Sequence, residues 1–158
     1  MKLATLTLVI RQGRPDVLLL GRKKRGFGHG KYNGFGGKIE PGEDARHAAA
    51  REVAKECGLE VAPQALVPAG RIVFCVPTDP NLDHDVALFL TTTWHGEPRE
   101  TEEMAPEWFP ANALPFAQMW QDDAIWLPLV LAGRVLDAEF TFADDNETVA
   151  SSSIRCRP

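Results

Sequence analysis

Residues 37–43 read Gly-Lys-Ile-Glu-Pro-Gly-Glu, and residues 51–59 read Arg-Glu-Val-Ala-Lys-Glu-Cys-Gly-Leu. The first segment predicts a tight glycine-rich loop and the second a helix, on which Glu52 and Glu56 form an acidic pair one turn apart. Like charges at this spacing cost a helix roughly 0.2–0.5 kcal/mol, and a divalent cation that prefers oxygen ligands would compensate them. The alternative is a solvated acidic face, but the adjoining loop and the terminating Gly58 favour a site for a metal-bound di- or triphosphate.

The helix is expected to begin at Glu43 or Asp44 and to end at Gly58. Either acid can cap the start and suits the positive end of the helix dipole, whereas glycine readily ends a helix. Four apolar positions share one arc at about 100° per residue and are predicted to face the core: Ala50, Val53, Ala54 and Cys57. The acidic pair and Lys55 are then expected on the opposite side.

Length, charge and cysteine content are typical of one compact enzyme domain. The 158 residues predict a single domain over residues 1–150 and a flexible tail over 151–158. The net charge of −5 argues against a broad surface for a nucleic acid polymer or a membrane. The three scattered cysteines indicate reduced thiols, and the chain shows neither a signal peptide nor a long apolar run. A cytoplasmic protein is therefore expected.

Alternating patterns and turn residues predict the remaining elements. Strands are expected at residues 3–10, 16–20, 71–76, 85–92 and 135–142. A second helix is expected over residues 122–131. Strands on both sides of two helices predict an α/β fold in which a mixed β-sheet lies between helices.

The loop and helix together resemble the Nudix box, G-x5-E-x7-R-E-U-x-E-E-x-G-U, in which U is aliphatic. Eight positions match at the required spacing: Gly37, Glu43, Arg51, Glu52, Val53, Glu56, Gly58 and Leu59. Lys55 departs from the pattern, because it stands where the first acid of the E-E pair belongs. In the family this acid usually helps to hold a divalent ion, so the number of metals bound stays open.

Segments outside the box resemble the oxidized purine nucleoside triphosphatases, the eukaryotic-type MutT homologues that sanitise nucleotide pools. These segments occur in the same order within residues 3–142: Lys23–Gly28, Asn33–Lys38, Ile72–Phe74, Glu103–Phe109 and Met119–Trp126. The resemblance implies the Nudix fold, an α/β/α sandwich with a mixed sheet. It also implies Mg²⁺-dependent hydrolysis, with Mn²⁺ as a substitute, to the nucleoside monophosphate and pyrophosphate. The lead substrate is 8-oxo-dGTP, and 2-hydroxy-dATP is a further candidate.

The resemblance implies two overlapping sets of residues at the phosphate end of the site. The catalytic set is Glu43, Arg51, Glu52 and Glu56, in which Arg51 is expected to pair with Glu43 and to fix the loop against the helix. The metal set is Gly36, through its carbonyl, with Glu52, Glu56 and Glu103. Glu103 matches an acid that often completes the family's metal site. Glu102 is the competing candidate, and a merely charged loop is the alternative for both.

A second group of residues is predicted to form a purine pocket. Four aromatic side chains could wall a flat base or could simply pack in the core: Phe27, Phe74, Trp120 and Trp126. Asn33 could read a base edge or could be a turn residue beside glycine. Asp122 and Asp123 could cap a helix, but the matching family residues hydrogen-bond the base. If the two carboxylates lie close together, repulsion raises the pKa of one, which could then donate a proton and widen the range of purines accepted. Lys23 is expected to face the triphosphate or the pocket.

The expected partner is a nucleotide substrate, bound by a monomer. Two other functions are kept open. One is a Nudix hydrolase of another nucleoside diphosphate derivative. The other is a non-catalytic, nucleotide-sensing Nudix domain, which the departure at Lys55 makes conceivable.

Overall fold

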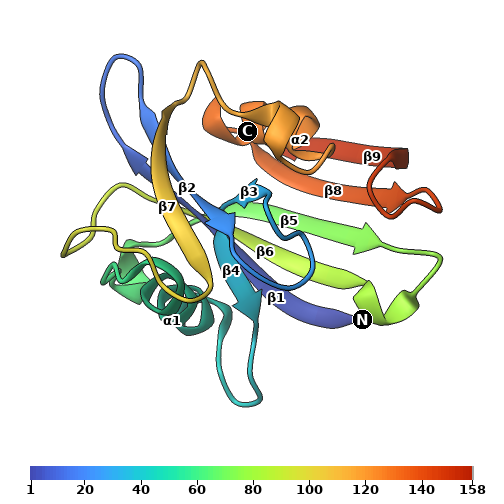
Figure 1. Ribbon diagram of the computed structural model, residues 1–158, viewed down its shortest axis with the longest axis horizontal. Coiled ribbons are helices and arrows are strands. Elements are labelled where there is room, and N and C mark those ends of the chain that lie inside the picture. Colours follow the sequence, from blue (N-terminus) through green and yellow to red (C-terminus); the bar gives the residue numbers. More distant parts are fainter. Residues whose placement is uncertain (158) are drawn as a thin grey trace.

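A computed structural model describes residues 1–157 of the chain and shows one mixed sheet of nine strands in this range (Figure 1). The strands are β1 (Lys2–Arg11), β2 (Val17–Lys23), β3 (Tyr32–Asn33), β4 (Phe35–Lys38), β5 (Val67–Cys75), β6 (His84–Thr91), β7 (Met104–Pro110), β8 (Val135–Phe142) and β9 (Val149–Arg157). The helices are α1 (Ala45–Cys57) and α2 (Asp123–Leu131). Short 3₁₀ turns lie at Pro63–Ala65, Pro80–Leu82 and Phe116–Gln118.

The strand order is β3-β2-β1-β6-β5-β8-β9, with β4 paired to β1 and β7 paired to β2. Strand β1 runs parallel to β6, and β5 runs parallel to β8, whereas the other pairs are antiparallel. Because strand side chains alternate between faces, β1 contributes Leu8 to one core and Val9 to another. The first core contains Trp126 of α2, and the second contains Val53 of α1. The expected α/β fold, a mixed sheet between helices, is confirmed.

Helix α1 has the ends that the sequence predicts. The Asp44 carboxylate accepts a hydrogen bond of 2.9 Å from the His47 N–H, so Asp44 rather than Glu43 caps the start. Gly58 ends the helix with φ of 78°, and its N–H donates to the Ala54 carbonyl at 2.9 Å.

The prediction of which face of α1 is buried is partly wrong. Val53 and Cys57 are fully buried as expected, but Ala54 is exposed. Glu52 and Glu56, expected opposite the core, are 6% and 8% exposed. The reason is β4, which pairs with β1 and packs against α1. The acidic pair therefore faces β4 instead of solvent.

The predicted flexible tail is also wrong over the described residues. Residues 149–157 form β9, which pairs antiparallel with β8, so the boundary expected at residue 150 falls inside a strand. Without β9, the main-chain groups along β8 would be unpaired at a sheet edge, and Ile154 also packs against the core. Pro158 lies outside the described residues. In residues 1–157, no helix is long and apolar enough to cross a membrane.

Candidate active site

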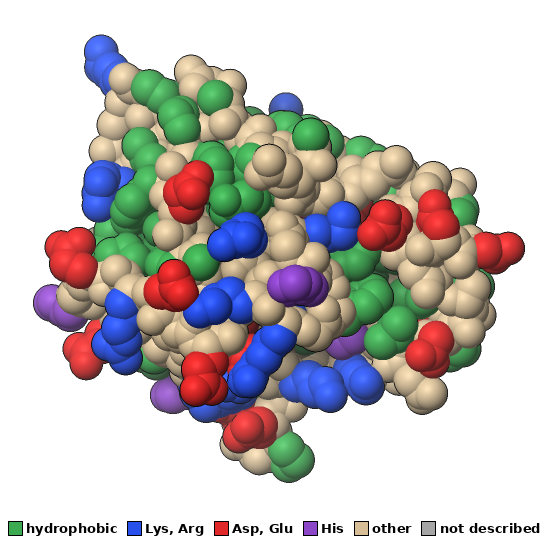
Figure 2. All heavy atoms as spheres, in the orientation of Figure 1, with side chains coloured by type: hydrophobic (Ala, Val, Ile, Leu, Met, Phe, Trp, Pro, Cys, Tyr) green, Lys and Arg blue, Asp and Glu red, His purple; other side chains and the backbone are tan. Residues whose placement is uncertain are grey.

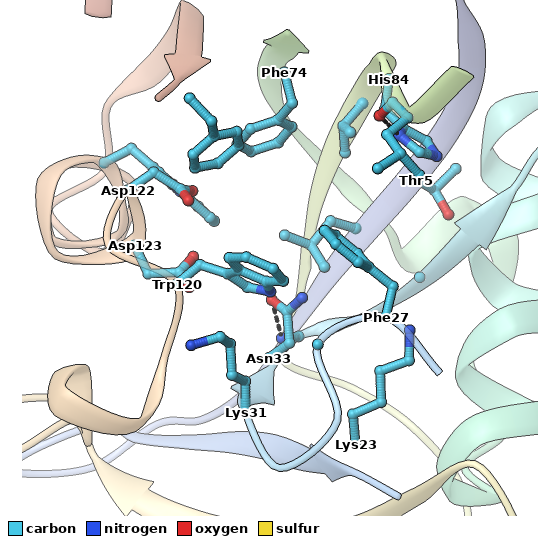
Figure 3. A pocket seen from close by; sticks show the side chains of 18 of the residues that line it. Thr5, Lys23, Phe27, Lys31, Asn33, Phe74, His84, Trp120, Asp122 and Asp123 are labelled. Carbon is cyan, nitrogen blue, oxygen red and sulfur yellow. Dashed lines mark hydrogen bonds between the residues drawn. The ribbon is translucent and has the colours of Figure 1, made fainter. Parts of the chain in front are cut away.

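One cavity of about 240 Å³ holds all the residues predicted to bind substrate (Figure 3). These residues are Lys23, Phe27, Asn33, Phe74, Trp120, Asp122, Asp123 and Trp126. The same cavity reaches Gly36 and Glu56, so the predicted base pocket is continuous with one member of the acidic pair. The residues come from β2, β3, β4, β5, α1, α2 and the connecting loops, which only the folded chain brings together.

Aromatic side chains form the walls of this cavity. Phe27 is 54% exposed and stacks on Trp120, with ring centroids 5.0 Å apart. Phe74 is held by ring contacts with Phe140 and Phe142. These walls suit the faces of a planar base.

Of the two positions expected for Trp126, a wall of the base pocket or the core, the structure shows the core. Its ring is 1% exposed and lies in the core, and its indole N–H donates to Asp122 Oδ2 at 2.8 Å. Although it borders the cavity, Trp126 therefore supports Asp122 rather than offering an open face to a base.

Asp122 and Asp123 are the buried polar end of the cavity, each 3% exposed. The Asp122 side chain makes no capping hydrogen bond to α2, so the capping alternative is not what the structure shows. Burial raises the pKa of Asp122 to about 6. Burial, and then the charge of Asp122, raises the pKa of Asp123 well above its usual value. Asp123 Oδ2 has no hydrogen-bond partner among the described residues, so it is available to a ligand.

Three further cavity residues with polar or charged side chains were not identified from the sequence. Thr5 of β1 places a buried hydroxyl in the cavity wall, without a hydrogen-bond partner in the described part of the chain. His84 and Lys31 also line the cavity. No sequence signal distinguishes Thr5 from any other threonine in an alternating strand. Asn33, which was identified, accepts the Gly34 N–H through Oδ1 at 3.0 Å, and its amide nitrogen can donate elsewhere.

The acidic pair packs directly on glycine backbone. Glu56 Oε1 accepts the Gly36 N–H at 2.8 Å. A Cβ atom at Gly37 would lie 2.6 Å from the Glu52 carboxyl carbon, so a side chain at this position would have to displace the Glu52 carboxylate. Burial, reinforced by the charge of Glu52, raises the pKa of Glu56 to about 7.

The expected ion pair between Arg51 and Glu43 is present and bidentate. Arg51 Nε lies 2.8 Å from Glu43 Oε2, and Arg51 Nη2 lies 2.9 Å from Glu43 Oε1. Arg51 also donates to Glu52 Oε1 at 2.7 Å and to the Lys38 carbonyl at 3.0 Å. The Arg51 guanidinium lowers the pKa of Glu43 to about 2. One arginine thus joins the glycine loop, β4 and the acidic pair.

The two acids predicted outside the box differ in position. Glu103 forms an ion pair of 2.6 Å with Arg25, and its side chain is 27% exposed. The Glu102 side chain is 89% exposed, and its carboxylate lies farther from the same guanidinium, at 3.9 Å. Of the two acids, Glu103 is therefore the better placed to complete a metal site. Lys55 is exposed, and its charge contributes to lowering the pKa of Glu103, behind the larger effect of Arg25.

A divalent cation fits the chemistry of the acidic pair. Two buried carboxylates repel one another and supply hard oxygen ligands, and a cation would relieve both burial and repulsion. Within residues 1–157, no group of three or more His, Cys, Asp or Glu side chains is gathered in a metal-binding arrangement, because Glu103 is held by Arg25. Of the predicted metal set, the structure therefore brings Gly36, Glu52 and Glu56 together, and Gly36 contacts Glu56 through its N–H.

A NUDIX domain model matches residues 1–130, and the chain belongs to this family, whose hydrolases generally use a divalent metal ion. Within the family, the chain is 44% identical over 154 residues to an oxidized purine nucleoside triphosphate hydrolase of Mus musculus, covering 98% of this chain and 94% of that protein. It is 46% identical over 141 residues to the Danio rerio protein of the same description, covering 89% and 86%.

A solved structure also shares the fold. The MutT protein of Bacillus halodurans superposes with a TM-score of 0.81 over 98% of this chain and 97% of that chain. At 22% sequence identity, this likeness concerns the fold alone.

Proposed function

We propose that this chain is a divalent-metal-dependent hydrolase of oxidized purine nucleoside triphosphates, which releases the nucleoside monophosphate and pyrophosphate. The observation that carries the proposal is the single cavity, which joins an aromatic pocket ending in two buried aspartates to Glu56 of the buried acidic pair. The two relatives described as oxidized purine nucleoside triphosphate hydrolases cover nearly the whole chain and support the same substrate class.

The two aspartates supply the means of recognising the base. Because both pKa values are raised, the pair holds a proton near neutral pH and presents one donor and one acceptor. Asn33 adds an amide donor from the other side of the cavity. We propose 8-oxo-dGTP as the lead substrate. A proton that can move between the carboxyls would let 2-hydroxy-dATP bind as well.

Glu52 and Glu56 would hold the cation, for which we propose Mg²⁺ with Mn²⁺ as a substitute. When bound, such an ion neutralises phosphate oxygens and favours the ionised form of an attacking water. Arg51 orients Glu43 and Glu52, and Lys23 places an ammonium in the cavity that can face the phosphates. Although the net charge is −5, Figure 2 shows Lys and Arg side chains gathered over the middle of one face, where they can attract a triphosphate.

We further propose that the protein acts as a cytoplasmic monomer. The candidate site is built from residues of one chain. The three cysteines are unpaired in the part of the chain that the structure describes, as expected in a reducing compartment.

The decisive experiment is an assay of pyrophosphate release from 8-oxo-dGTP, 2-hydroxy-dATP and dGTP, with Mg²⁺ and with a chelator. We expect metal-dependent release, faster from the oxidized substrates. Equal rates on all three, with faster metal-dependent formation of nucleoside monophosphate from another nucleoside diphosphate derivative assayed alongside, would favour that alternative substrate class. Nucleotide binding without any metal-dependent release would favour the non-catalytic, sensing alternative.

The base pocket is tested by Asn33→Ala and Asp122→Asn. Each variant should erode the preference for 8-oxo-dGTP over dGTP, since an unpaired buried polar group costs roughly 1–3 kcal/mol. The asparagine in Asp122→Asn can still accept the Trp126 indole N–H, so the fold should persist. The measurement is the ratio of kcat/KM for the two substrates, with the exposed Asp137→Asn as the control. Unchanged ratios in both pocket variants would contradict the assignment.

The departure from the box is tested by Lys55→Glu. The Lys55 side chain is exposed, so the wild type should be active but need more metal than a chain with a complete acidic box. An added carboxylate near Glu103 should lower the Mg²⁺ concentration for half-maximal rate, and high salt should weaken this effect because the site is exposed. A magnesium titration that shows no shift, or a shift to higher concentration, would show that Lys55 does not act on the metal site.

A further inference from the structure

Lys31 stands at the outer edge of the base pocket. Its Nζ atom lies 5.0 Å from the centroid of the Trp120 ring and 3.6 Å from Glu147 Oε1. The Lys31 side chain is only 25% exposed. Figure 3 shows it directed toward Trp120 and Asp123. The function proposed above gives this lysine no task.

The loop that carries Lys31 packs against the Trp120 ring. Phe27 stacks on the Trp120 ring, and a Cβ atom at Gly28 would lie 3.1 Å from the same ring. The Lys31 N–H donates to the Gly28 carbonyl at 3.0 Å, and the Lys31 carbonyl accepts the Lys23 N–H at 2.9 Å. Because both main-chain groups of Lys31 are hydrogen-bonded, the backbone that carries its ammonium group has a defined position.

Glu147, the partner of Lys31, belongs to a well-bonded turn between β8 and β9. Asp145 Oδ1 accepts the N–H groups of Glu147 and Thr148 at 2.9 and 2.8 Å. Gln121 Oε1 accepts the Val149 N–H at 2.6 Å. The turn is therefore attached to the segment that carries Trp120, and the Lys31–Glu147 ion pair joins a residue that lines the pocket to this turn.

We propose that Lys31 is a positioning residue that controls whether the Asp122–Asp123 pair holds a proton, and that Glu147 is the counterion that limits its influence. The inference rests on the proposed function, because the aspartate pair is what would recognise an oxidized purine. The inference adds that a residue outside the pair, Lys31, sets the pH range in which the pair recognises an oxidized purine.

The titratable side chains that line the cavity with Asp122 and Asp123 indicate that Lys31 is the residue acting on this pair. Besides the aspartates, four titratable side chains line the cavity: Lys23, Lys31, Glu56 and His84. The other side chains around the aspartate end are uncharged: Asn33, Phe74, Trp120, Trp126 and Phe142. Burial, and then the charge of Asp122, raise the pKa of Asp123, whereas a main-chain hydrogen bond from Trp120 and, after it, the charge of Lys31 lower this pKa. A nearby cation favours the carboxylate, and an anion beside that cation weakens its effect.

The first experiment follows the aspartate carboxyl carbons by NMR during a pH titration of the free protein. Lys31→Met should raise the midpoint of the pair by about 0.5–1 pH unit, because the carboxylate loses a stabilising cation. Glu147→Gln should lower the midpoint, since Lys31 is then less neutralised. Lys31→Arg keeps the charge and should retain the wild-type midpoint. Lys24→Met, a change in the same loop at a lysine that pairs with Glu100, should leave it unchanged.

The second experiment measures kcat/KM for 8-oxo-dGTP against pH, where the same variants should shift the profile in the same directions. A lysine with only a structural role would change the rate without moving the profile. Midpoints that do not move in Lys31→Met and Glu147→Gln would overturn the inference, and Glu147 is 63% exposed, so its variant should fold. If oxidized purines are not hydrolysed, the proposed function fails, yet the titration of the free protein still decides the role of Lys31.

Discussion

Glu56→Gln is expected to lower the rate of metal-dependent pyrophosphate release by orders of magnitude while the protein remains folded. The substitution removes one of the two charged oxygen ligands in the acidic pair, and a hard divalent cation depends on such charge. The glutamine oxygen can still accept the Gly36 N–H, which Glu56 Oε1 accepts at 2.8 Å in the wild type.

The pH dependence of stability separates the loss of metal from a loss of fold. The pKa of Glu56 is raised to about 7, so ionising this buried carboxyl costs stability progressively as the pH rises from its usual pKa of 4.5 toward 7. Without metal, Glu56→Gln should therefore be at least as stable as the wild type at pH values above 7. Activity should be measured over a range of Mg²⁺ concentrations, with the exposed Glu97→Gln as the control. Near-native turnover in Glu56→Gln would show that the assigned metal site is wrong.

Gly36→Ala is expected to destabilise the protein by roughly 3 kcal/mol or more, as severe overpacking of a closed site does. A Cβ atom at this position would lie 1.8 Å from the Thr5 carbonyl oxygen and 3.0 Å from the Leu6 Cα atom. These are backbone atoms of β1 and cannot rotate aside, so β4 would have to move away from β1. Glu56 would then lose its main-chain partner, and hydrolysis should fall together with stability.

Urea unfolding of the metal-free protein measures this effect. Gly13→Ala is the matched control, because a Cβ atom there meets only the Pro15 carbonyl oxygen, at 3.2 Å, and the position lies outside the cavity. The two variants should differ clearly in the urea concentration at the midpoint. A Gly36→Ala midpoint equal to that of the wild type would mean that β4 is not held against β1 as the structure indicates.

Much of the candidate site could be predicted from the sequence because its chemistry is local in the chain. The spacing of Glu52 and Glu56 defines one helix face, and Gly58 ends the helix through a conformation that glycine adopts readily. The Arg51–Glu43 pair was expected from the box and is present. The purine pocket required the resemblance to a known family, since an aromatic residue or an asparagine has no local signature of binding.

Residues whose surroundings come from a distant strand were predicted less well. Strand β7 was not predicted, and its pairing with β2 joins residues 81 to 93 positions apart in the chain. For Trp126 the sequence left a pocket wall and core packing open, and the core position of α2 buries its ring and turns its N–H toward Asp122. Residues 151–158 were predicted to be a flexible tail because they end the chain, whereas the edge of β8 supplies the main-chain partners that order β9.

The sequence by itself determined the family pattern, the ends of α1, the alternation that places Leu8 and Val9 in different cores, and the ligand chemistry of the acidic pair. These follow from helix period, strand period and residue type, which act over a few neighbouring positions. Only the tertiary structure decided that the acidic pair is buried, that Glu103 is held by Arg25, and that Lys31 lines the same cavity as the aspartates. Burial and the sum of nearby charges depend on segments far apart in the chain, and these quantities set the pKa values on which recognition and metal binding depend.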